Sequence, residues 1–230
     1  MTEVVPVITI DGPVGTGKGT IAQRLATKLG WHILDSGAIY RLLALGASSA
    51  NVASTDIDGL VQLCKRLDTE FLPGELDEPV RVVLDGRDVS DAIRTEKNGE
   101  AASRLAGHQA VRAALMARQQ AFQQAPGLVA DGRDMGTVVF PDAPLKLFLT
   151  ASPEERAERR YKQLIAKGID GSLANLLADN NSRDKRDRER VIAPLKPAED
   201  AIVIDTTGKS IANVHDQVME LVSSKSLVGT

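Results

Sequence analysis

A glycine-rich segment near the N-terminus carries the clearest chemical signal in the sequence. Residues 12–20 read GPVGTGKGT, and Gly12, Gly17 and Lys18 match the pattern G-x-x-x-x-G-K. Glycines allow backbone N–H groups to hold phosphate oxygens, and a helix that starts beside them adds partial positive charge. Lys18 adds a mobile ammonium group for the donor phosphates. We therefore predict a nucleotide phosphate site made of Gly12, Pro13, Val14, Gly15, Thr16, Gly17, Lys18, Gly19 and Thr20.

The same loop suggests where Mg²⁺ would bind. Gly19 stands where a serine or threonine usually follows the lysine, so Thr20 is the candidate hydroxyl ligand. Asp131 ends an apolar run and is a candidate to hold a metal-bound water, and Asp35 is an alternative at a similar position. Magnesium at such sites relies largely on substrate phosphates and water, so few protein ligands are expected.

These residues need a rigid scaffold, and the hydrophobic pattern predicts an α/β one. Short apolar runs at 4–10, 32–35, 128–131, 145–150 and 201–206 alternate with helical patterns. Five buried strands separated by helices indicate a parallel five-stranded sheet with helices on both faces. Ligands bind beyond the carboxyl ends of such strands. The segments GPVGTGKGT, DSGAIYR and DGRD follow three of these runs, so we expect them to meet there.

Composition excludes several classes of protein. The 230 residues are 43% hydrophobic and 26% charged, as in ordinary globular proteins. No run approaches the roughly 18 apolar residues of a membrane span, and the first residues lack the basic region of a signal peptide. Cys64 is the only cysteine, so no internal disulfide is possible and we expect a cytoplasmic protein. A net charge of -3 and 3% aromatic residues argue against a nucleic-acid partner.

Four strings in order are similar to those of bacterial-type cytidylate kinases, within the nucleoside monophosphate kinases of the P-loop class. They are ITIDGPVGTGKGT, LDSGAIYR, ADGRDMGTVVFPDA and RDKRDRER, and they reach from the first strand past residue 190. The resemblance implies transfer of a phosphoryl group from ATP, with Mg²⁺, to CMP or dCMP. It also implies a single P-loop kinase domain over 1–230. The core would comprise 1–64, 105–152 and 169–230, with a nucleotide-binding insert at about 65–104 and a lid at about 153–168.

The resemblance also assigns the acceptor site residue by residue. Asp134, Arg112 and Ser103 would bind the base, because a carboxylate accepts from the cytosine amino group and an arginine donates to the ring acceptors. Uracil would place an acceptor against Asp134, which disfavours it. The acceptor phosphate would be held by Ser36, Arg41, Arg133 and Arg190, and the pentose by Arg183 and Asp187.

Structural alternatives stay open for several of these residues. Asp134 could cap a helix or pair with Arg133, Ser36 could be a simple N-cap, and Arg112 could be a solvated residue of an amphipathic helix. The run RDKRDRER could be a solvated helix face with alternating charges. Residues Arg183, Asp187 and Arg190 nevertheless share the spacing i, i+4, i+7, which favours one common face.

The expected chemistry needs cations rather than a catalytic base. The acceptor oxygen belongs to a phosphate that is already ionised at neutral pH, so charge stabilisation and positioning dominate. We assign the catalytic roles to Lys18, Arg133, Arg156 and Arg160, the last two on the lid with Arg159. The three histidines form no recognisable constellation.

Other functions remain as alternatives. The nearest is a kinase for uridylate, another nucleotide or a small metabolite. A nucleotide-dependent switch would lack a second nucleotide site, and the sequence contains no guanine-reading N-K-x-D string. A nucleic-acid-binding module is disfavoured because acids interleave the bases in RDKRDRER. No long apolar seam calls for a partner, so we expect a monomer.

Overall fold

The computed structural model describes residues 5–72, 80–166, 168–225 and 227. The predicted core, insert and lid include residues 1–4, 73–79, 167, 226 and 228–230, and for these positions the prediction lies outside the described residues.

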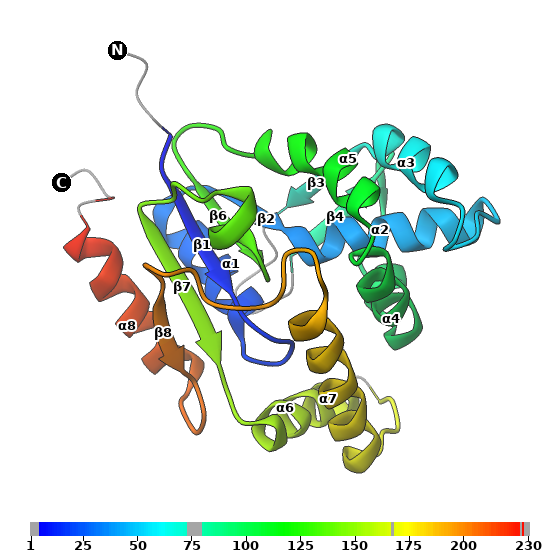
Figure 1. Cartoon of the computed structure of the whole chain (residues 1–230). Helices are drawn as coiled ribbons and strands as arrows, with labels where there is room; N and C mark the ends of the chain where they lie inside the picture. Colours follow the sequence, from blue (N-terminus) through cyan, green and yellow to red (C-terminus); the bar gives the residue numbers. More distant parts are fainter. Residues whose placement is uncertain (1–4, 73–79, 167, 226, 228–230) are drawn as a thin grey trace.

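A five-stranded parallel sheet forms the centre of the molecule, which confirms the predicted fold class (Figure 1). Its strand order is β2-β6-β1-β7-β8. The strands are β1 (Val7–Asp11), β2 (His32–Asp35), β6 (Leu128–Gly132), β7 (Leu145–Thr150) and β8 (Ile202–Asp205). Because all of them run the same way, the glycine loop after β1 and the polar segments after β2 and β6 meet at one edge of the sheet.

Alternate residues of the strands supply two separate hydrophobic cores. Ile8, Ile33 and Val129 belong to the core on one face, and Leu34 and Leu128 belong to the core on the other. Helices α1 (Lys18–Leu29) and α8 (Ile211–Ser224) cover the first face, and α2 (Ser36–Ser49), α3 (Ile57–Arg66) and α5 (Gln109–Gln120) cover the second. Burial on both faces explains why the strands read as continuous apolar runs.

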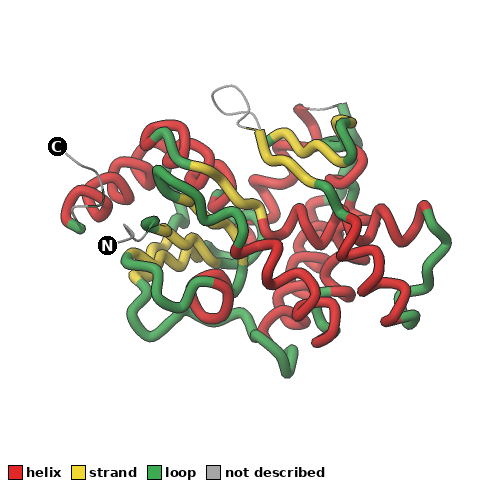
Figure 2. Tube along the Cα trace, turned by 90° about the horizontal axis from the view of Figure 1, so that it is seen from above, coloured by secondary structure: helices red, strands yellow, loops and turns green. Residues whose placement is uncertain are grey.

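The segment predicted to be the insert forms a small unit beside the main sheet. It contains an antiparallel sheet of β3 (Thr69–Leu72), β4 (Arg81–Leu84) and β5 (Arg87–Asp88), followed by the 3₁₀ turn η1 (Ala92–Arg94) and helix α4 (Glu96–Leu105). Figure 2 shows this sheet set apart from the central one. The described part of residues 72–91 therefore contains two short strands, β4 and β5.

Two helices near the carboxyl edge of the sheet complete the fold. Helix α6 (Pro153–Ala166) begins where Ser152 Oγ accepts a hydrogen bond from the backbone N–H of Glu155, the bond that a Ser-x-x-Glu capping pattern makes. Helix α7 (Leu173–Glu189) packs against α6 and also contacts α4 (Figure 1). A short π-helical turn, η2 (Met135–Val139), follows β6. Together these elements surround the end of the sheet that carries the glycine loop.

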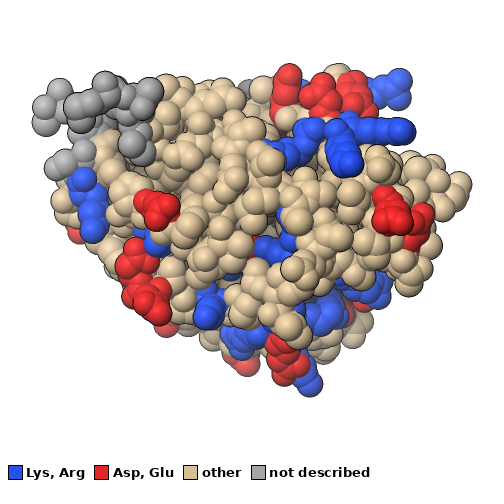
Figure 3. Space-filling model, turned by 45° about the horizontal axis from the view of Figure 1, so that its top comes forward, with Lys and Arg blue, Asp and Glu red and all other residues tan. Residues whose placement is uncertain are grey.

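The surface carries mixed charge. On the face shown in Figure 3, acidic and basic side chains lie next to each other near the margins, and the middle is largely uncharged. This face therefore offers no continuous basic stripe for a phosphate backbone. Among the described residues, every helix is too short or too polar to span a lipid bilayer.

Candidate active site

The glycine loop is wound tightly between β7 and α6. Gly12 has φ 149°, and a Cβ there would lie 2.1 Å from the carbonyl oxygen of Leu149. Gly15 has φ 83°, and a Cβ there would lie 2.9 Å from Cβ of Arg156. Only glycine fits these backbone angles and distances without strain, so the loop is shaped by the residues that the sequence pattern singles out.

Lys18 reaches back across the loop. Its Nζ donates a hydrogen bond to the carbonyl oxygen of Pro13 at 3.2 Å, and the Thr16 hydroxyl donates to the same oxygen at 3.1 Å. Burial lowers the pKa of Lys18, and the nearby carboxylate of Asp131 opposes that shift. The Lys18 side chain is half-buried, and an anion bound beside it would favour its charged form.

Asp131 explains the glycine that follows the lysine. A Cβ at Gly19 would lie 3.2 Å from Oδ2 of Asp131, so a larger residue would crowd this carboxylate. Burial raises the pKa of Asp131, and the charge of Lys18 opposes the shift. Oδ1 of Asp131 is buried and has no hydrogen-bond partner among the described residues.

That unpaired oxygen fits the predicted magnesium site. Asp35, the alternative, uses Oδ1 to cap α2 by accepting from the backbone N–H of Ala38 at 2.9 Å. Thr20, Asp35 and Asp131 all line the cleft at the glycine loop. The described residues contain no group of three His, Cys, Asp or Glu side chains able to hold a metal.

A cleft of about 820 Å³ lies over the glycine loop. Its lining comes from the glycine loop, the carboxyl ends of β2 and β6, the insert and both helices α6 and α7. The predicted residues in its lining are Val14, Gly15, Gly17, Lys18, Gly19, Thr20, Arg41, Asp131, Arg156, Arg160 and Arg183. Of the loop residues, Gly12, Pro13 and Thr16 are not in the lining, because Gly12 packs on β7 and Pro13 and Thr16 bond within the loop.

A second, smaller cavity of about 40 Å³ shares Arg183 with the first. The other predicted residues in its lining are Ser36, Ser103, Arg112, Arg133, Asp134, Asp187 and Arg190. The structure therefore brings together all the residues that the resemblance assigns to the acceptor, except Arg41, which lines the larger cleft.

Asp134 and Arg112 form a buried ion pair in the smaller cavity. Arg190 lies 3.9 Å from the other carboxylate oxygen of Asp134. Both structural alternatives for Asp134 are therefore wrong, because it makes no side-chain cap of the following turn and Arg133 pairs elsewhere. The alternative of a solvated Arg112 is also wrong, since its side chain is 6% exposed.

Asp187 organises the neighbouring arginine. It forms an ion pair with Arg133 and accepts a hydrogen bond from the Ser103 hydroxyl at 3.3 Å. Burial raises the pKa of Asp187, but the charges of Arg133, Arg183 and Arg190 outweigh it and hold the pKa below its ordinary value. The run 183–190 is therefore not a solvated face, because its inward residues lie against this cavity.

Arg41 lines the larger cleft and Arg183 lines both cavities, so their positive charges lie close together. Neither forms an ion pair within the described ranges, and Nε of Arg183 is buried without a hydrogen-bond partner there. Burial, together with the charges of Arg133 and Arg41, lowers the pKa of Arg183 to about 9. Burial likewise lowers the pKa of Arg41. Guanidinium groups that repel one another in this way are arranged to receive an anion.

Ser36 is oriented by a residue far along the chain. Its hydroxyl donates a hydrogen bond of 2.6 Å to Oε1 of Gln119, a buried residue of α5. The N-cap of α2 is Asp35, so the alternative of Ser36 as an N-cap is wrong. The polar Gln119 is a site residue that the sequence reasoning missed, because it lies 83 positions from Ser36.

The three lid arginines have different partners. Arg156 is 1% exposed and pairs with both carboxylate oxygens of Asp184 at 2.6 and 3.3 Å, and it also donates to the carbonyl oxygen of Val14 at 3.0 Å. Arg159 donates to the carbonyl oxygen of Thr16 at 3.3 Å. These two side chains attach the lid to the glycine loop in this conformation.

Arg160 instead joins the lid to the insert. It pairs with Oε1 of Glu96 through Nη2 at 2.5 Å and through Nε at 2.8 Å. Both side chains are partly exposed and line the larger cleft. This ion pair therefore connects α4 to α6 within the lining of the larger cleft.

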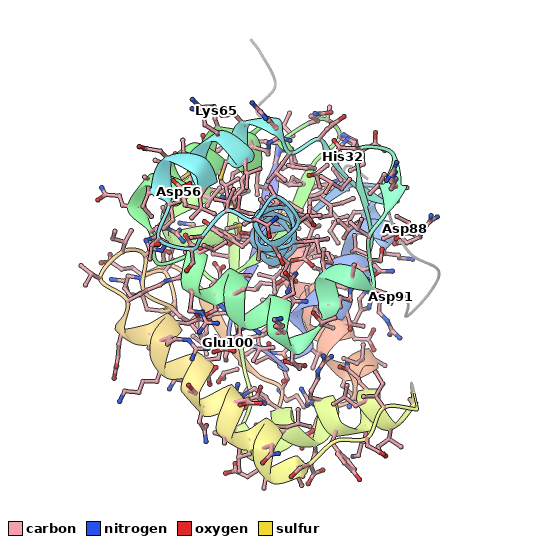
Figure 4. All side chains as sticks on the ribbon, turned by 90° about the vertical axis from the view of Figure 1, so that its right-hand side faces the viewer. His32, Asp56, Lys65, Asp88, Asp91 and Glu100 are labelled. Carbon is pink, nitrogen blue, oxygen red and sulfur yellow. The ribbon has the colours of Figure 1, made fainter. Side chains whose placement is uncertain are left out.

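Other titratable residues, which Figure 4 labels, take no part in the ion pairs described above. Figure 4 shows Asp56 and Lys65 at the two ends of α3 and Asp88 and Asp91 at the edge of the insert. His32 is exposed, and its ring Nε2 lies 3.0 Å from the carbonyl oxygen of Ala125. None of these five residues lines either cavity.

The comparisons with known proteins agree with this geometry. A family model described as cytidylate kinase matches residues 8–224. A cytidylate kinase from Stutzerimonas stutzeri is 55% identical over 229 residues and covers 100% of both chains. A cytidylate kinase from Nitrosococcus oceani is 55% identical over 226 residues, covering 98% of this chain and 100% of that protein. The resemblance seen in four sequence strings thus extends over the whole described core, and the chain belongs to the cytidylate kinase family.

Proposed function

We propose that this protein transfers the γ-phosphoryl group of ATP directly to CMP or dCMP, giving ADP and CDP or dCDP. The observation that carries the proposal is that two cavities share Arg183 in their linings. One contains the glycine loop and Lys18, and the other contains the buried pair of Arg112 and Asp134. Two nucleotides that bind end to end would place their phosphates between these sites.

The smaller cavity supports cytosine as the acceptor base. Asp134 offers a carboxylate to the cytosine amino group, and Arg112 offers donors to the ring acceptors. Uracil would turn a carbonyl oxygen toward Asp134, and two facing acceptors repel each other. Ser103 and Asp187 lie on the same wall and suit the base and the pentose hydroxyls respectively.

The phosphate chemistry proceeds without a proton acceptor. The attacking oxygen of CMP is already ionised, so the barrier comes from bringing two anions together. Ser36, Arg41, Arg133, Arg183 and Arg190 surround the acceptor phosphate in this proposal, and Lys18 holds the donor phosphates. Arg156 and Arg160 approach from the lid, where closure would exclude water that competes as acceptor.

Magnesium would be held beside the glycine loop by Asp131 and Thr20. When bound with ATP, the ion neutralises charge on the phosphates that develops during transfer. Asp131 supplies a buried, unpaired carboxylate oxygen on the protein side, and Thr20 supplies a hydroxyl in the same lining. The substrates favour a cytoplasmic enzyme, and we extend the proposal to a monomer, which light scattering would test.

A panel of acceptors tests the proposal. ATP and Mg²⁺ are supplied with CMP, dCMP, UMP or AMP, and ADP release is measured. We expect CMP and dCMP to be the preferred acceptors, and equal or higher kcat/KM for UMP would contradict the proposal. Asp134→Asn should lower the CMP-to-UMP ratio of kcat/KM by about tenfold or more, since the amide can face either base. The exposed carboxylate variant Asp142→Asn is the matched control and should leave the ratio unchanged.

A further inference from the structure

We propose that Asp11 is a positioning residue that fixes the base-reading carboxylate of Asp134. The inference rests on the proposed function and adds to it a residue outside both cavity linings. Asp11 is the last residue of β1, directly before the glycine loop, and it is 4% exposed.

The contact joins the donor loop to the acceptor loop. Oδ1 of Asp11 accepts from the backbone N–H of Met135 at 2.9 Å, and Oδ2 accepts from that of Gly136 at 2.8 Å. These two amides follow Asp134 directly in the chain. One carboxylate therefore holds two successive peptide units, which fixes both the position and the rotation of the backbone that carries Asp134.

The surrounding packing leaves this backbone little room. A Cβ at Gly136 would lie 2.8 Å from Oγ1 of Thr9, and a Cβ at Gly132 would lie 2.7 Å from Cγ of Met135. The turn must therefore sit close against β1. Asp134 makes no cap of this turn with its own side chain, so its carboxylate remains available to pair with Arg112.

A purely structural explanation makes a different prediction. A buried carboxylate is costly unless its hydrogen bonds are made, so Asp11 could simply satisfy two backbone amides. In that case replacing Asp11 would lower the free energy of unfolding and would change the KM values for ATP and CMP to the same extent. A positioning role instead predicts a loss that is specific to the acceptor, because the amides lead to Asp134 and not to Lys18.

The test uses Asp11→Asn in the full chain. The side chain keeps its size, but its amide has one acceptor, so one of the two N–H groups loses its partner. We expect the KM for CMP and the calorimetric Kd for CMP to rise about tenfold, and the CMP-to-UMP ratio of kcat/KM to fall. The KM for ATP should stay within about twofold of the native value. Such a rise corresponds to about 1.4 kcal/mol, within the range for a single hydrogen bond.

Asp142→Asn is the matched control. It is the same chemical change at an exposed carboxylate that lies outside both cavity linings. We expect native constants for both substrates. If Asp11→Asn does not fold, Asp11→Glu keeps the charge but displaces it by one methylene group, and the same acceptor-specific loss is expected.

Two outcomes are distinguishable. Equal losses for ATP and CMP, or a lowered stability with an unchanged KM for CMP, would overturn the role of Asp11. Failure of the native protein to phosphorylate CMP at all would instead overturn the proposed function.

Discussion

At the scale of single residues, Lys18 should matter for transfer more than for acceptor binding. Its ammonium lies in the lining of the larger cleft and not of the smaller one. We expect Lys18→Ala to lower kcat by about 10²–10³, as loss of an electrostatic group at a transition state does, with the Kd for CMP within a few-fold of native. Steady-state kinetics and calorimetry measure the two effects. Lys28 is exposed on the same helix, so Lys28→Ala is the control and should change neither kcat nor the Kd for CMP. Equal losses in kcat and in CMP binding for Lys18→Ala would contradict the role of Lys18 at the donor phosphates.

Asp11 should give the protein a pH-dependent stability. Burial raises its pKa from 3.8 to about 7, while the amides of Gly136 and Met135 and the charge of Lys18 oppose the shift and Asp134 adds to it. A raised pKa means that the folded state holds the proton more tightly than the unfolded state. The contribution of Asp11 to stability is therefore greatest below about pH 4 and is lost as the pH rises to about 7.

Urea unfolding of the native protein and of Asp11→Asn measures this effect. The free energy of unfolding of the native protein, relative to the variant, should fall between pH 5 and pH 7 by up to about 1.4 kcal/mol per unit and then level off. A difference that rises with pH over this interval would show that the carboxyl is stabilised in its ionised form.

The sequence indicated which side chains matter, but not how they pair. The glycine loop and Lys18 follow from local spacing and chemistry, whereas the arginines of the acceptor site were assigned by the resemblance to cytidylate kinases. The pairs Asp134 with Arg112 and Asp187 with Arg133 join positions 22 and 54 apart, so only the fold brings them together. The role of Asp11 could not be predicted for the same reason, since its hydrogen-bond partners are backbone amides 124 and 125 positions away.

At the scale of elements, the contact between α6 and α7 includes one buried ion pair, between Arg156 and Asp184. Asp184→Ala would leave the guanidinium of Arg156 buried with only carbonyl partners. We expect the free energy of unfolding to fall by about 3–5 kcal/mol, because an uncompensated buried charge is strongly unfavourable. Urea denaturation measures the change.

The exposed residue Glu189, at the end of the same helix, provides the control for that measurement. Glu189→Ala should change the free energy of unfolding by less than about 0.5 kcal/mol. A loss below about 1 kcal/mol for Asp184→Ala would mean that Arg156 finds other compensation and that the pair does not hold the helices together.

The elements themselves were largely predictable. The five apolar runs became the five strands, because strands buried on both faces leave an unbroken hydrophobic signal. The start of α6 followed from its capping pattern. The start of α2 was harder, since Asp35 and Ser36 are both good caps and only the tertiary contact of Ser36 with Gln119 separates their roles.

At the scale of the whole molecule, the sheet brings two cavities to one edge, and arginines fill the space between them. Arg183 lines both, and Arg41 and Arg133 adjust its pKa by their charge. Helices α4 and α6 are joined at this edge by the ion pair of Glu96 with Arg160. Glu100, which Figure 4 labels on α4, also lines the larger cleft. Such an arrangement suits closure over two anionic ligands.

The most direct measurement is a crystal structure with CMP and a non-hydrolysable ATP analogue bound together. We expect the cytosine beside Asp134 and Arg112, its phosphate among Arg41, Arg133 and Arg183, and the terminal phosphate of the analogue on Lys18, in line with the CMP oxygen. A pyrimidine bound away from the smaller cavity, or phosphates too far apart for direct transfer, would contradict the account.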